Sequence, residues 1–279
     1  MLTTSQNSNY NTGYLVKLEF SINMHIKDKN LLEAIKNFFG VGTVRVYEKN
    51  DLAYFTVNRK EELSVIIAHF DKYSLISQKR SDFELFKSSY KLISNKEHFT
   101  KEGLEKLIAI KASINWGLTP TLKGAFPNIT PVPRPALKLP GNINSQWLAG
   151  FIDGEGCFFI GILKSKFTQI GYQIQLKLKI TQHSRDIELL NLIRDKLNCG
   201  NVSKRSNKLA VDYVVTKTAD LSEKILPFFE KYPLLGVKSK DLADFRKAIE
   251  IILVKGHLTE KGLKEISEIK SGMNSGRCF

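Results

Sequence analysis

The sequence predicts an α+β protein built from two similar units that a proline-rich segment joins. Two observations carry this prediction. Blocks of similar sequence recur about 158 residues apart, and in each copy a strand-like stretch of alternating polar and apolar residues precedes a stretch with helical spacing. Antiparallel strands of this kind bury one face on helices and leave the other face exposed. We therefore expect each unit to be a sheet with helices packed on one side.

Several separated blocks of sequence show the internal duplication. GYLVKLEFSINMHIKDKNLLEAI begins at Gly13, and GYQIQLKLKITQHSRDIELLNLI begins at Gly171, 158 residues later. FDKYSLISQK at Phe70 matches FEKYPLLGVK at Phe229 with an offset of 159, as KEHFTKEGL matches KGHLTEKGL. We attribute the one additional residue to a loop. A chance match over separated blocks is implausible, so the chain is a tandem repeat.

The boundaries between the repeats follow from the prolines. Five of the eight prolines of the chain lie between residues 126 and 145. Segments rich in proline are extended and semi-rigid, and they commonly act as spacers. We therefore expect a first repeat over residues 1–125, a linker over 126–145 and a second repeat over 146–279, with the two repeats related by a pseudo-twofold axis.

Each repeat shows the same order of elements. A long strand with strict alternation is expected over 14–23 and 172–181, followed by a helix whose apolar residues are Leu31, Leu32, Ile35 and Phe38 in the first repeat and Leu189, Leu190, Ile193 and Leu197 in the second. Two shorter strands come next, over 43–47 and 53–57 and then over 202–205 and 210–215. Further helices are expected near 61–72 and 240–255.

The charge balance points to a polyanionic partner. The chain has 42 Lys and Arg against 28 Asp and Glu, a formal net charge of +14, and the excess is spread along the sequence. Spread positive charge on a folded body favours nucleic acid. No apolar run approaches the roughly 20 residues that a membrane-spanning helix needs, so we expect no membrane association. Cys157, Cys199 and Cys278 lack the spacing of a disulfide framework or a zinc site.

The outward row of the long strand in each repeat carries long polar side chains. Gln and Arg are able to read base edges, and Lys neutralises phosphates, so such a face suits a DNA groove. The alternative is a solvated sheet face that binds nothing. The residues that we expect to contact DNA are Lys17, Glu19, Arg45, Lys164, Lys166, Gln173, Gln175, Lys177, Lys179, Lys204 and Arg205.

The second repeat opens with the segment WLAGFIDGEGCF, which starts at Trp147. This segment resembles the LAGLIDADG motif of the homing endonucleases, in the form common in fungal organelle introns, and similarity to that family extends over nearly the whole chain. The resemblance implies an αββαββα unit in each repeat and a motif helix that packs closely on its twin through Ala149, Gly150 and Gly154. It also implies a monomer that cuts both strands of a specific duplex DNA target.

The same resemblance assigns roles at the end of the motif. Glu155 matches the acid that holds Mg²⁺ against the scissile phosphate, and the backbone carbonyl of Gly154 is a further candidate ligand. Lys217 matches a basic residue near the cleavage site, or it is an ordinary phosphate contact. Gln182 matches a polar residue that orders the catalytic water, or it makes a structural hydrogen bond.

Three other residues are expected to have structural roles. We expect Asp153 to support or cap the local backbone. His25 and His183 occupy matched positions near strand ends, and no nucleophile accompanies them, so we interpret both as structural.

The expected function is a homing-type, Mg²⁺-dependent endonuclease that acts in the mitochondrion. A different class remains open, namely a non-cleaving nucleic-acid-binding protein such as an RNA maturase that assists intron splicing. A basic patch away from the sheet faces would favour RNA.

A second motif is not present among residues 1–120. With the offset of 158, the counterpart of Glu155 falls at position −3, ahead of Met1. Three explanations remain: the reading frame starts further upstream, the frame is a decayed relic, or the protein binds without cutting. We expect a chain with one acid to be impaired in double-strand cleavage. We also expect self-association, because Leu148 and Phe151 would lose the helix that covers them.

Overall fold

The computed structural model describes residues 1–136 and 138–277 and divides the chain into two compact units, Met1–Lys138 and Leu139–Phe279. Each unit contains antiparallel strands and helices, which confirms the predicted α+β class. Cys278, one of the three cysteines considered above, lies outside the described residues. Cys157 and Cys199 are not in a disulfide.

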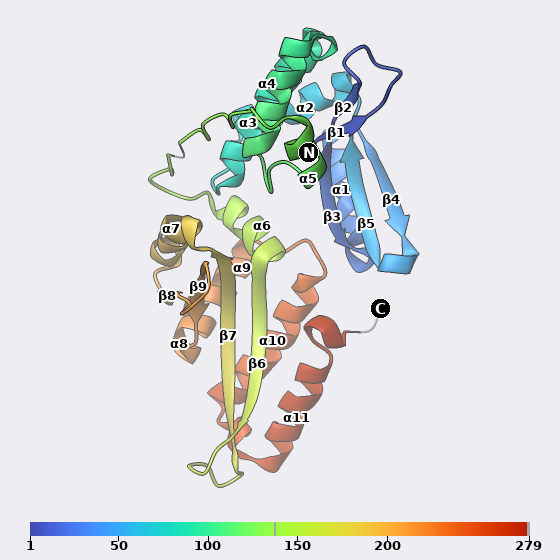
Figure 1. Cartoon of the computed structure of the whole chain (residues 1–279). Helices are drawn as coiled ribbons and strands as arrows, with labels where there is room; N and C mark the ends of the chain where they lie inside the picture. Colours follow the sequence, from blue (N-terminus) through green and yellow to red (C-terminus); the bar gives the residue numbers. More distant parts are fainter. Residues whose placement is uncertain (137, 278–279) are drawn as a thin grey trace. The chain divides into compact units, whose positions relative to one another are not determined.

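In the described part of unit 1, five strands form two sheets, ordered β1-β2 and β3-β5-β4. Its strands are β1 (Leu2–Gln6), β2 (Tyr14–Leu18), β3 (Phe20–His25), β4 (Thr43–Tyr47) and β5 (Leu52–Val57). Its helices are α1 (Lys29–Phe39), α2 (Lys60–Lys72), α3 (Lys79–Ser94), α4 (Lys101–Ser113) and α5 (Pro120–Ala125), with short 3₁₀ turns at η1 (Ile26–Asp28), η2 (Glu48–Asn50) and η3 (Glu97–Phe99). In Figure 1, α1 lies behind the β3-β5-β4 sheet.

Unit 2 contains one four-stranded sheet in the order β6-β7-β9-β8. Its strands are β6 (Gly156–Lys164), β7 (Tyr172–His183), β8 (Asn201–Lys204) and β9 (Ala210–Val215). Its helices are α6 (Ser145–Glu155), α7 (Ile187–Leu197), α8 (Thr218–Asp220), η5 (Leu221–Ile225), α9 (Leu226–Lys231), α10 (Lys238–Leu253) and α11 (Glu260–Ser271), with 3₁₀ turns at η4 (Ser184–Asp186), η6 (Gly256–Leu258) and η7 (Asn274–Gly276). Figure 1 shows α10 and α11 behind β6 and β7.

The strand registers of the two units repeat the sequence duplication residue by residue. Leu2 pairs with Leu18 in unit 1, and the residues 158 positions later, Ile160 and Leu176, pair in unit 2. The β3–β5, β4–β5, β7–β9 and β8–β9 pairings obey the same offset. Since one shifted residue would turn every side chain to the other face, the sheets of unit 1 and the sheet of unit 2 present matched positions on matched faces.

The expectation that a loop accommodates the additional residue of the second repeat is wrong, because that residue lies inside a helix. The offset is 158 at Leu63 and Leu221, and it is 159 at Phe70 and Phe229. Between these points unit 1 has the continuous helix α2, whereas unit 2 has the π-helical turn η5 between α8 and α9. A π turn accommodates one extra residue without breaking the helix.

Two further expectations about unit 1 need correction. The long strand expected over 14–23 is divided at Glu19, where pairing passes from β1 to β5, whereas β7 pairs with both of its neighbours over Leu178–Ile180. Phe38 was expected in the core, but it is 71% exposed. Phe39 occupies the inward position instead and stacks against Phe55, because Leu32, Ile35 and Phe39 follow one face of α1.

The proline-rich segment is extended but packed on unit 1 as far as Pro135. The backbone N–H of Val132 donates to the carbonyl of Ala109, and Ser81 Oγ donates to the carbonyl of Pro135 at 2.8 Å. Arg134 forms an ion pair of 2.8 Å with Asp82. The first part of the segment is therefore part of the packed unit.

Candidate active site and DNA-binding face

Helix α6 runs directly into strand β6 without a loop. Asn144 caps its first turn by accepting from the N–H groups of Gln146 and Trp147. At the other end, a Cβ on Gly156 would lie 2.6 Å from Cγ2 of Ile152 and 2.7 Å from its carbonyl oxygen. Glycine is therefore required at the junction. This junction fixes Glu155, the last residue of α6, at the end of the sheet.

The apolar face of α6 packs within unit 2. Leu148, Ala149 and Ile152 are at most 4% exposed, and α6 contacts β6 and β7. This corrects the expectation that Leu148 is left exposed, because its side chain packs on the core side of the helix. Phe151 is half-buried, and its ring stacks on that of Trp147 with a centroid separation of 4.9 Å.

The loop between α9 and α10 holds the last turn of α6. Oδ2 of Asp153 accepts two hydrogen bonds of 2.8 Å, from the backbone N–H groups of Leu235 and Gly236. Lys238 Nζ donates to the carbonyls of Ile152 and Gly154, each at 3.3 Å. Asp153 therefore has the supporting role that was expected of it. These contacts restrict the orientation of the residue that follows.

Glu155 is exposed and bonded to a residue from the end of β7. Gln182 Nε2 donates to Glu155 Oε2 at 3.0 Å. The structure thus brings together two of the residues that the sequence nominated. His183, the next residue, accepts from the N–H of Arg185 and caps η4, as His25 caps η1 in unit 1, so both histidines have the expected structural role.

Lys217 lies apart from this pair. It is exposed and precedes α8, two residues beyond Val215, whose strand partner is Leu178. Gln182 instead pairs with Val211 at the other end of β9. Within the described residues the structure gives Lys217 no contact with Glu155 or Gln182.

The oxygen donors at the end of α6 fit a hard divalent cation. The carboxylate of Glu155 and the carbonyl of Gly154 are the ligand types that Mg²⁺ prefers, and Mg²⁺ retains several waters when it binds to few protein groups. The Gly154 carbonyl has a second lone pair besides the one that Lys238 uses. Over residues 1–136 and 138–277, no group of three or more His, Cys, Asp and Glu is placed to enclose a metal by itself.

The face of the unit 2 sheet opposite the helices carries the predicted polar row. Alternation buries Leu176, Leu178 and Ile180 and turns Gln173, Gln175, Lys177 and Lys179 to the other side. Register places Arg205 beyond β8 on this outer face, whereas Lys204 pairs with the buried Val211 and falls on the helix side. Lys164 ends β6, and Lys166 lies in the exposed β6–β7 turn.

An ion cluster on this outer face was missed from the sequence. Asp212 of β9 is 8% exposed and binds the guanidinium of Arg205 through two hydrogen bonds, Nε to Oδ2 at 2.7 Å and Nη2 to Oδ1 at 2.9 Å. Thr181 donates to Asp212 at 2.6 Å, and Lys179 Nζ lies 3.2 Å from Oδ2. Burial by itself raises the pKa of the Asp212 carboxyl, but these hydrogen bonds lower the pKa to about 2.

The corresponding face of unit 1 carries different chemistry. Lys17 lies in β2 and pairs with Thr3, Glu19 lies at the break between β2 and β3, and Arg45 lies in β4 and pairs with Tyr54. Tyr47 and Tyr54, the counterparts of Arg205 and Asp212, contact each other edge to face, with ring centroids 5.2 Å apart. The strands of the two units therefore have matched registers but present different side chains.

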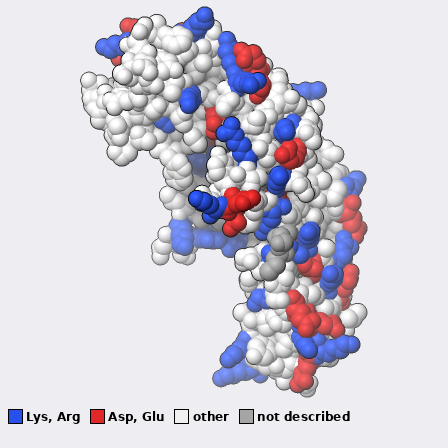
Figure 2. Space-filling model, turned by 90° about the vertical axis from the view of Figure 1, so that its right-hand side faces the viewer, with Lys and Arg blue, Asp and Glu red and all other residues white. Residues whose placement is uncertain are grey.

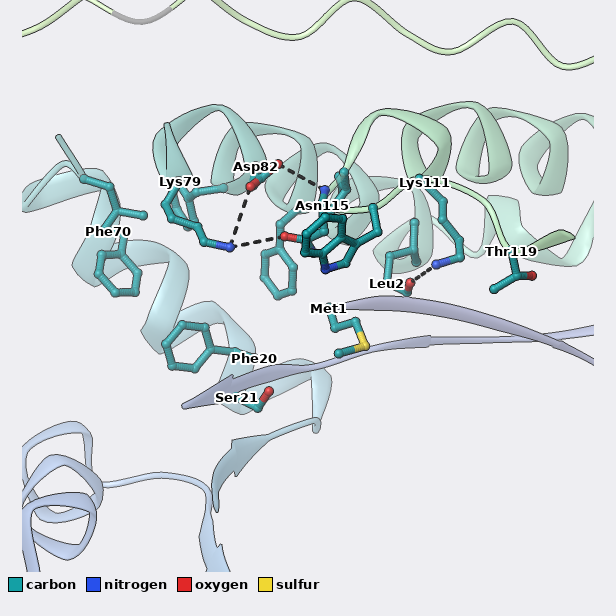
Figure 3. Close-up of a pocket in the computed structure, with 16 residues that line it drawn as sticks. Met1, Leu2, Phe20, Ser21, Phe70, Lys79, Asp82, Lys111, Asn115 and Thr119 are labelled. Carbon is teal, nitrogen blue, oxygen red and sulfur yellow. Dashed lines mark hydrogen bonds and ion pairs between the residues drawn. The ribbon is translucent and has the colours of Figure 1, made fainter. Parts of the chain in front are cut away.

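Unit 1 has an open apolar pocket of about 530 Å³ beside β1, α3 and α4 (Figure 3). Phe70 and Phe86 line it, and their counterparts in unit 2, Phe229 and Phe245, contact Phe158, which follows α6. Lys79 also lines it, and Figure 3 shows its ammonium directed at Asp82 and Asn115. The unit 1 counterparts of the residues that contact α6 and β6 in unit 2 therefore line a pocket.

The basic residues do not form a continuous positive surface on every face of the molecule. On the face drawn in Figure 2, Lys and Arg side chains stand among Asp and Glu side chains. Such a mixed surface does not favour RNA over DNA. None of the helices in the described part of the chain is both long and apolar enough to cross a membrane.

Comparisons with known proteins agree with this geometry. The sequence profile of the family described as "LAGLIDADG endonuclease" matches residues 1–90 and 148–249. Two relatives from Neurospora crassa, probable intron-encoded endonucleases 3 and 2, are 34% and 37% identical over 95% and 98% of this chain. The chain spans 50% and 62% of their lengths.

Solved structures resemble the whole chain. The meganuclease I-SmaMI, crystallised on uncleavable DNA, is 41% identical with a TM-score of 0.96, and the match covers 100% of this chain and 93% of that one. I-SmaMI has also been crystallised on an uncleaved DNA target with calcium ions. Profile, relatives and fold agree, and the chain belongs to the LAGLIDADG endonuclease family.

Proposed function

We propose that this chain is a site-specific endonuclease of duplex DNA that depends on Mg²⁺. The observation that carries the proposal is the hydrogen bond between Gln182 and Glu155 at the junction of α6 and β6, at the end of a sheet whose open face is rich in Lys, Gln and Arg. An exposed carboxylate fixed at the end of such a face would lie close to the DNA that the face binds, where it could take part in cleavage.

In the proposed reaction Glu155 is the metal-binding acid, and the Gly154 carbonyl is its neighbouring ligand. The cation, when bound, lowers the pKa of a water and offsets the charge that develops on the phosphate. Gln182 restrains Glu155 through Oε2 and leaves Oε1 for the metal. Its second amide hydrogen is available to orient water. Lys217, which lies apart from this pair, is proposed as a contact to the DNA backbone near the cut.

The DNA is proposed to lie against the open faces of the two sheets. The contacting residues are those nominated from the sequence apart from Lys204, which register places on the helix side of the sheet. The hairpin-tip lysines Lys164 and Lys166 are suited to phosphates. The crystal structures of I-SmaMI on DNA support this assignment. Relatives whose names place them in an ND4 intron and in a cox1 intron support action in the mitochondrion.

The pocket of unit 1 is proposed to accept a helix equivalent to α6. Lys79 is the counterpart of Lys238, which binds two carbonyls of the last turn of α6, and the apolar lining is equivalent to that around Phe158. A polypeptide limited to these 279 residues holds one acidic motif, so it is proposed to cut one strand. It is also proposed to self-associate, because the open pocket and Trp116, which is fully exposed, are apolar.

The test is selection followed by cleavage. The protein is used to select binding sites from a library of randomised DNA duplexes, and the selected site is placed in a supercoiled plasmid. We expect Mg²⁺-dependent nicking at that site, loss of nicking in Glu155→Gln, and normal nicking in Glu188→Gln, which removes an exposed acid of α7. Failure to enrich any duplex, together with tighter binding to intron RNA, would favour the maturase function instead.

A further inference from the structure

The guanidinium of Arg205 is held in one orientation on the open face of the unit 2 sheet. Nε and Nη2 donate to the two carboxylate oxygens of Asp212, and Nη2 also donates to Thr181 Oγ1 at 3.0 Å. Arginine has five N–H donors, and these contacts engage the three on Nε and Nη2. The two N–H groups of Nη1 remain for an acceptor outside the protein.

The contacts of this cluster fix the orientation of the Arg205 guanidinium and reduce its net positive charge. Asp212 is 8% exposed, and it neutralises part of the positive charge of Arg205 and Lys179. A lysine that binds phosphate works as a mobile point charge, and a neighbouring carboxylate weakens the attraction of any cation to phosphate. A fixed guanidinium instead favours an acceptor at a defined place, which is what the edge of a base provides.

The base that fits this donor is guanine. In the major groove guanine presents two acceptors, N7 and O6, and arginine is their commonest partner. We propose, on the assumption that the proposed DNA-binding function holds, that Arg205 recognises a guanine in the major groove and that Asp212 and Thr181 position its guanidinium for that contact. Asp212 is then a positioning residue, since its own oxygens are engaged by the protein.

Unit 1 has no equivalent of the Arg205, Asp212 and Thr181 cluster at the matched positions. Arg205, Asp212 and Thr181 correspond to Tyr47, Tyr54 and Asn23 with the offset of 158. The tyrosine pair offers aromatic edges and hydroxyl groups in place of a fixed cation. The matched base pairs of the two half-sites are therefore read by different chemistry. We expect guanine to be required in the half-site under unit 2, and a different preference at the symmetric position under unit 1.

The test is the base preference of the full 279-residue chain, measured by selection from randomised duplexes. The wild-type protein is compared with Arg205→Ala, Arg205→Lys and Asp212→Asn. Lys204→Ala is the matched control, since it removes an adjacent charge that register places on the other side of the sheet. Thermal melting identifies any variant that fails to fold. Arg205→Lys, which keeps the charge and loses the planar fork, serves if Arg205→Ala does not fold.

We expect one guanine of the selected site to lose its preference in the Arg205 variants, by about fivefold to 150-fold, while the other positions stay unchanged. Asp212→Asn should weaken the same preference without lowering affinity for random duplex. The proposal is overturned if the Arg205 variants bind every sequence more weakly with an unchanged consensus, which would indicate a phosphate contact. If the wild type selects no sequence at all, the DNA-binding function itself has failed.

Discussion

The amide of Gln182 donates a hydrogen bond of 3.0 Å to Oε2 of Glu155, and it links the end of β7 to the end of α6. Glu155 is exposed at the end of α6. The contact therefore matters for where the carboxylate points. An acid that holds a cation against a phosphate must present a defined oxygen, and Gln182 restricts which oxygen that is.

The first prediction concerns this contact. Gln182→Ala should reduce the nicking rate at saturating Mg²⁺ by about tenfold to a hundredfold, because one hydrogen bond to a charged group is lost. The Mg²⁺ concentration for half-maximal rate should rise as well. DNA affinity measured in Ca²⁺ should change little. A Gln182→Ala protein with wild-type rate and wild-type Mg²⁺ dependence would show that Gln182 has no role in positioning the acid.

The second prediction concerns salt. Binding to duplex DNA should weaken linearly with the logarithm of salt concentration, because each neutralised phosphate releases about 0.9 counterion. Lys177→Met should reduce this slope by about one, since Lys177 lies on the open sheet face. Lys261→Met is the control, because Lys261 is an exposed residue of α11 on the helix side. Equal slopes for the wild type and Lys177→Met would remove Lys177 from the interface.

Much of the fold follows from the sequence because the units repeat. Strict alternation predicted β7, and β4 and β9 have the predicted bounds. The π turn in η5 was not predictable, since a one-residue offset in sequence does not say whether a loop or a helix absorbs it. Phe38 and Phe39 are adjacent residues of the same type, and Phe39 is inward because it shares the face of α1 that carries Leu32 and Ile35.

The sequence predicted the site residues that local motifs mark, but not the contacts between distant segments. The motif located Glu155, and the resemblance to the family located Gln182. The hydrogen bonds from the backbone of Leu235 and Gly236 to Asp153 link residues that are 82 and 83 positions apart in the sequence. No local sequence pattern indicates such a contact. Asp212 had a weak signal, an acid at an outward position of a strand whose neighbours are basic. Its partner Arg205 had been interpreted only as a DNA contact.

The third prediction concerns acid stability. Asp212 has a folded-state pKa of about 2, below the ordinary 3.8, so its contribution is present above about pH 4 and is lost as the pH falls toward 2. The free energy of unfolding should drop by on the order of 1 to 2 kcal/mol over that interval through this group. Denaturant unfolding of the wild type and Asp212→Asn at several pH values measures it. The variant should lose less stability between pH 4 and 2; an identical loss would contradict the prediction.

The fourth prediction compares two glycines with similar backbone angles. Gly200 has φ of 79°, and a Cβ there would lie 2.7 Å from the ring of Tyr213; Gly171 has φ of 73° with nothing within 4 Å. Gly171→Ala should cost roughly 1 to 2 kcal/mol through backbone strain alone. Gly200→Ala should cost about 1 to 3 kcal/mol more, because the buried ring must move. Equal losses of unfolding free energy in the two variants, measured by denaturant unfolding, would show that the core around Tyr213 rearranges without loss of stability.

The fifth prediction joins the pocket of unit 1 to strand cleavage. Phe159 corresponds to Met1, so a copy of residues 144–158 fused ahead of Met1 supplies unit 1 with a helix like α6, a second acid and a phenylalanine for the ring cluster of Phe70 and Phe86. Burying that phenylalanine alone should stabilise unit 1 by about 2 kcal/mol, and the fusion should melt at a higher temperature.

The fusion should also convert nicked plasmid into linear plasmid, since each strand then has its own acid. The matched control carries Gln in place of the acid in the added copy only, and it should melt like the fusion yet stop at the nick. Self-association measured by sedimentation should decrease in both fusions, because the added helix covers the apolar pocket. Efficient linearisation by the unfused 279-residue protein as a monomer, or a fusion that melts no higher than that protein, would contradict the proposed role of the pocket.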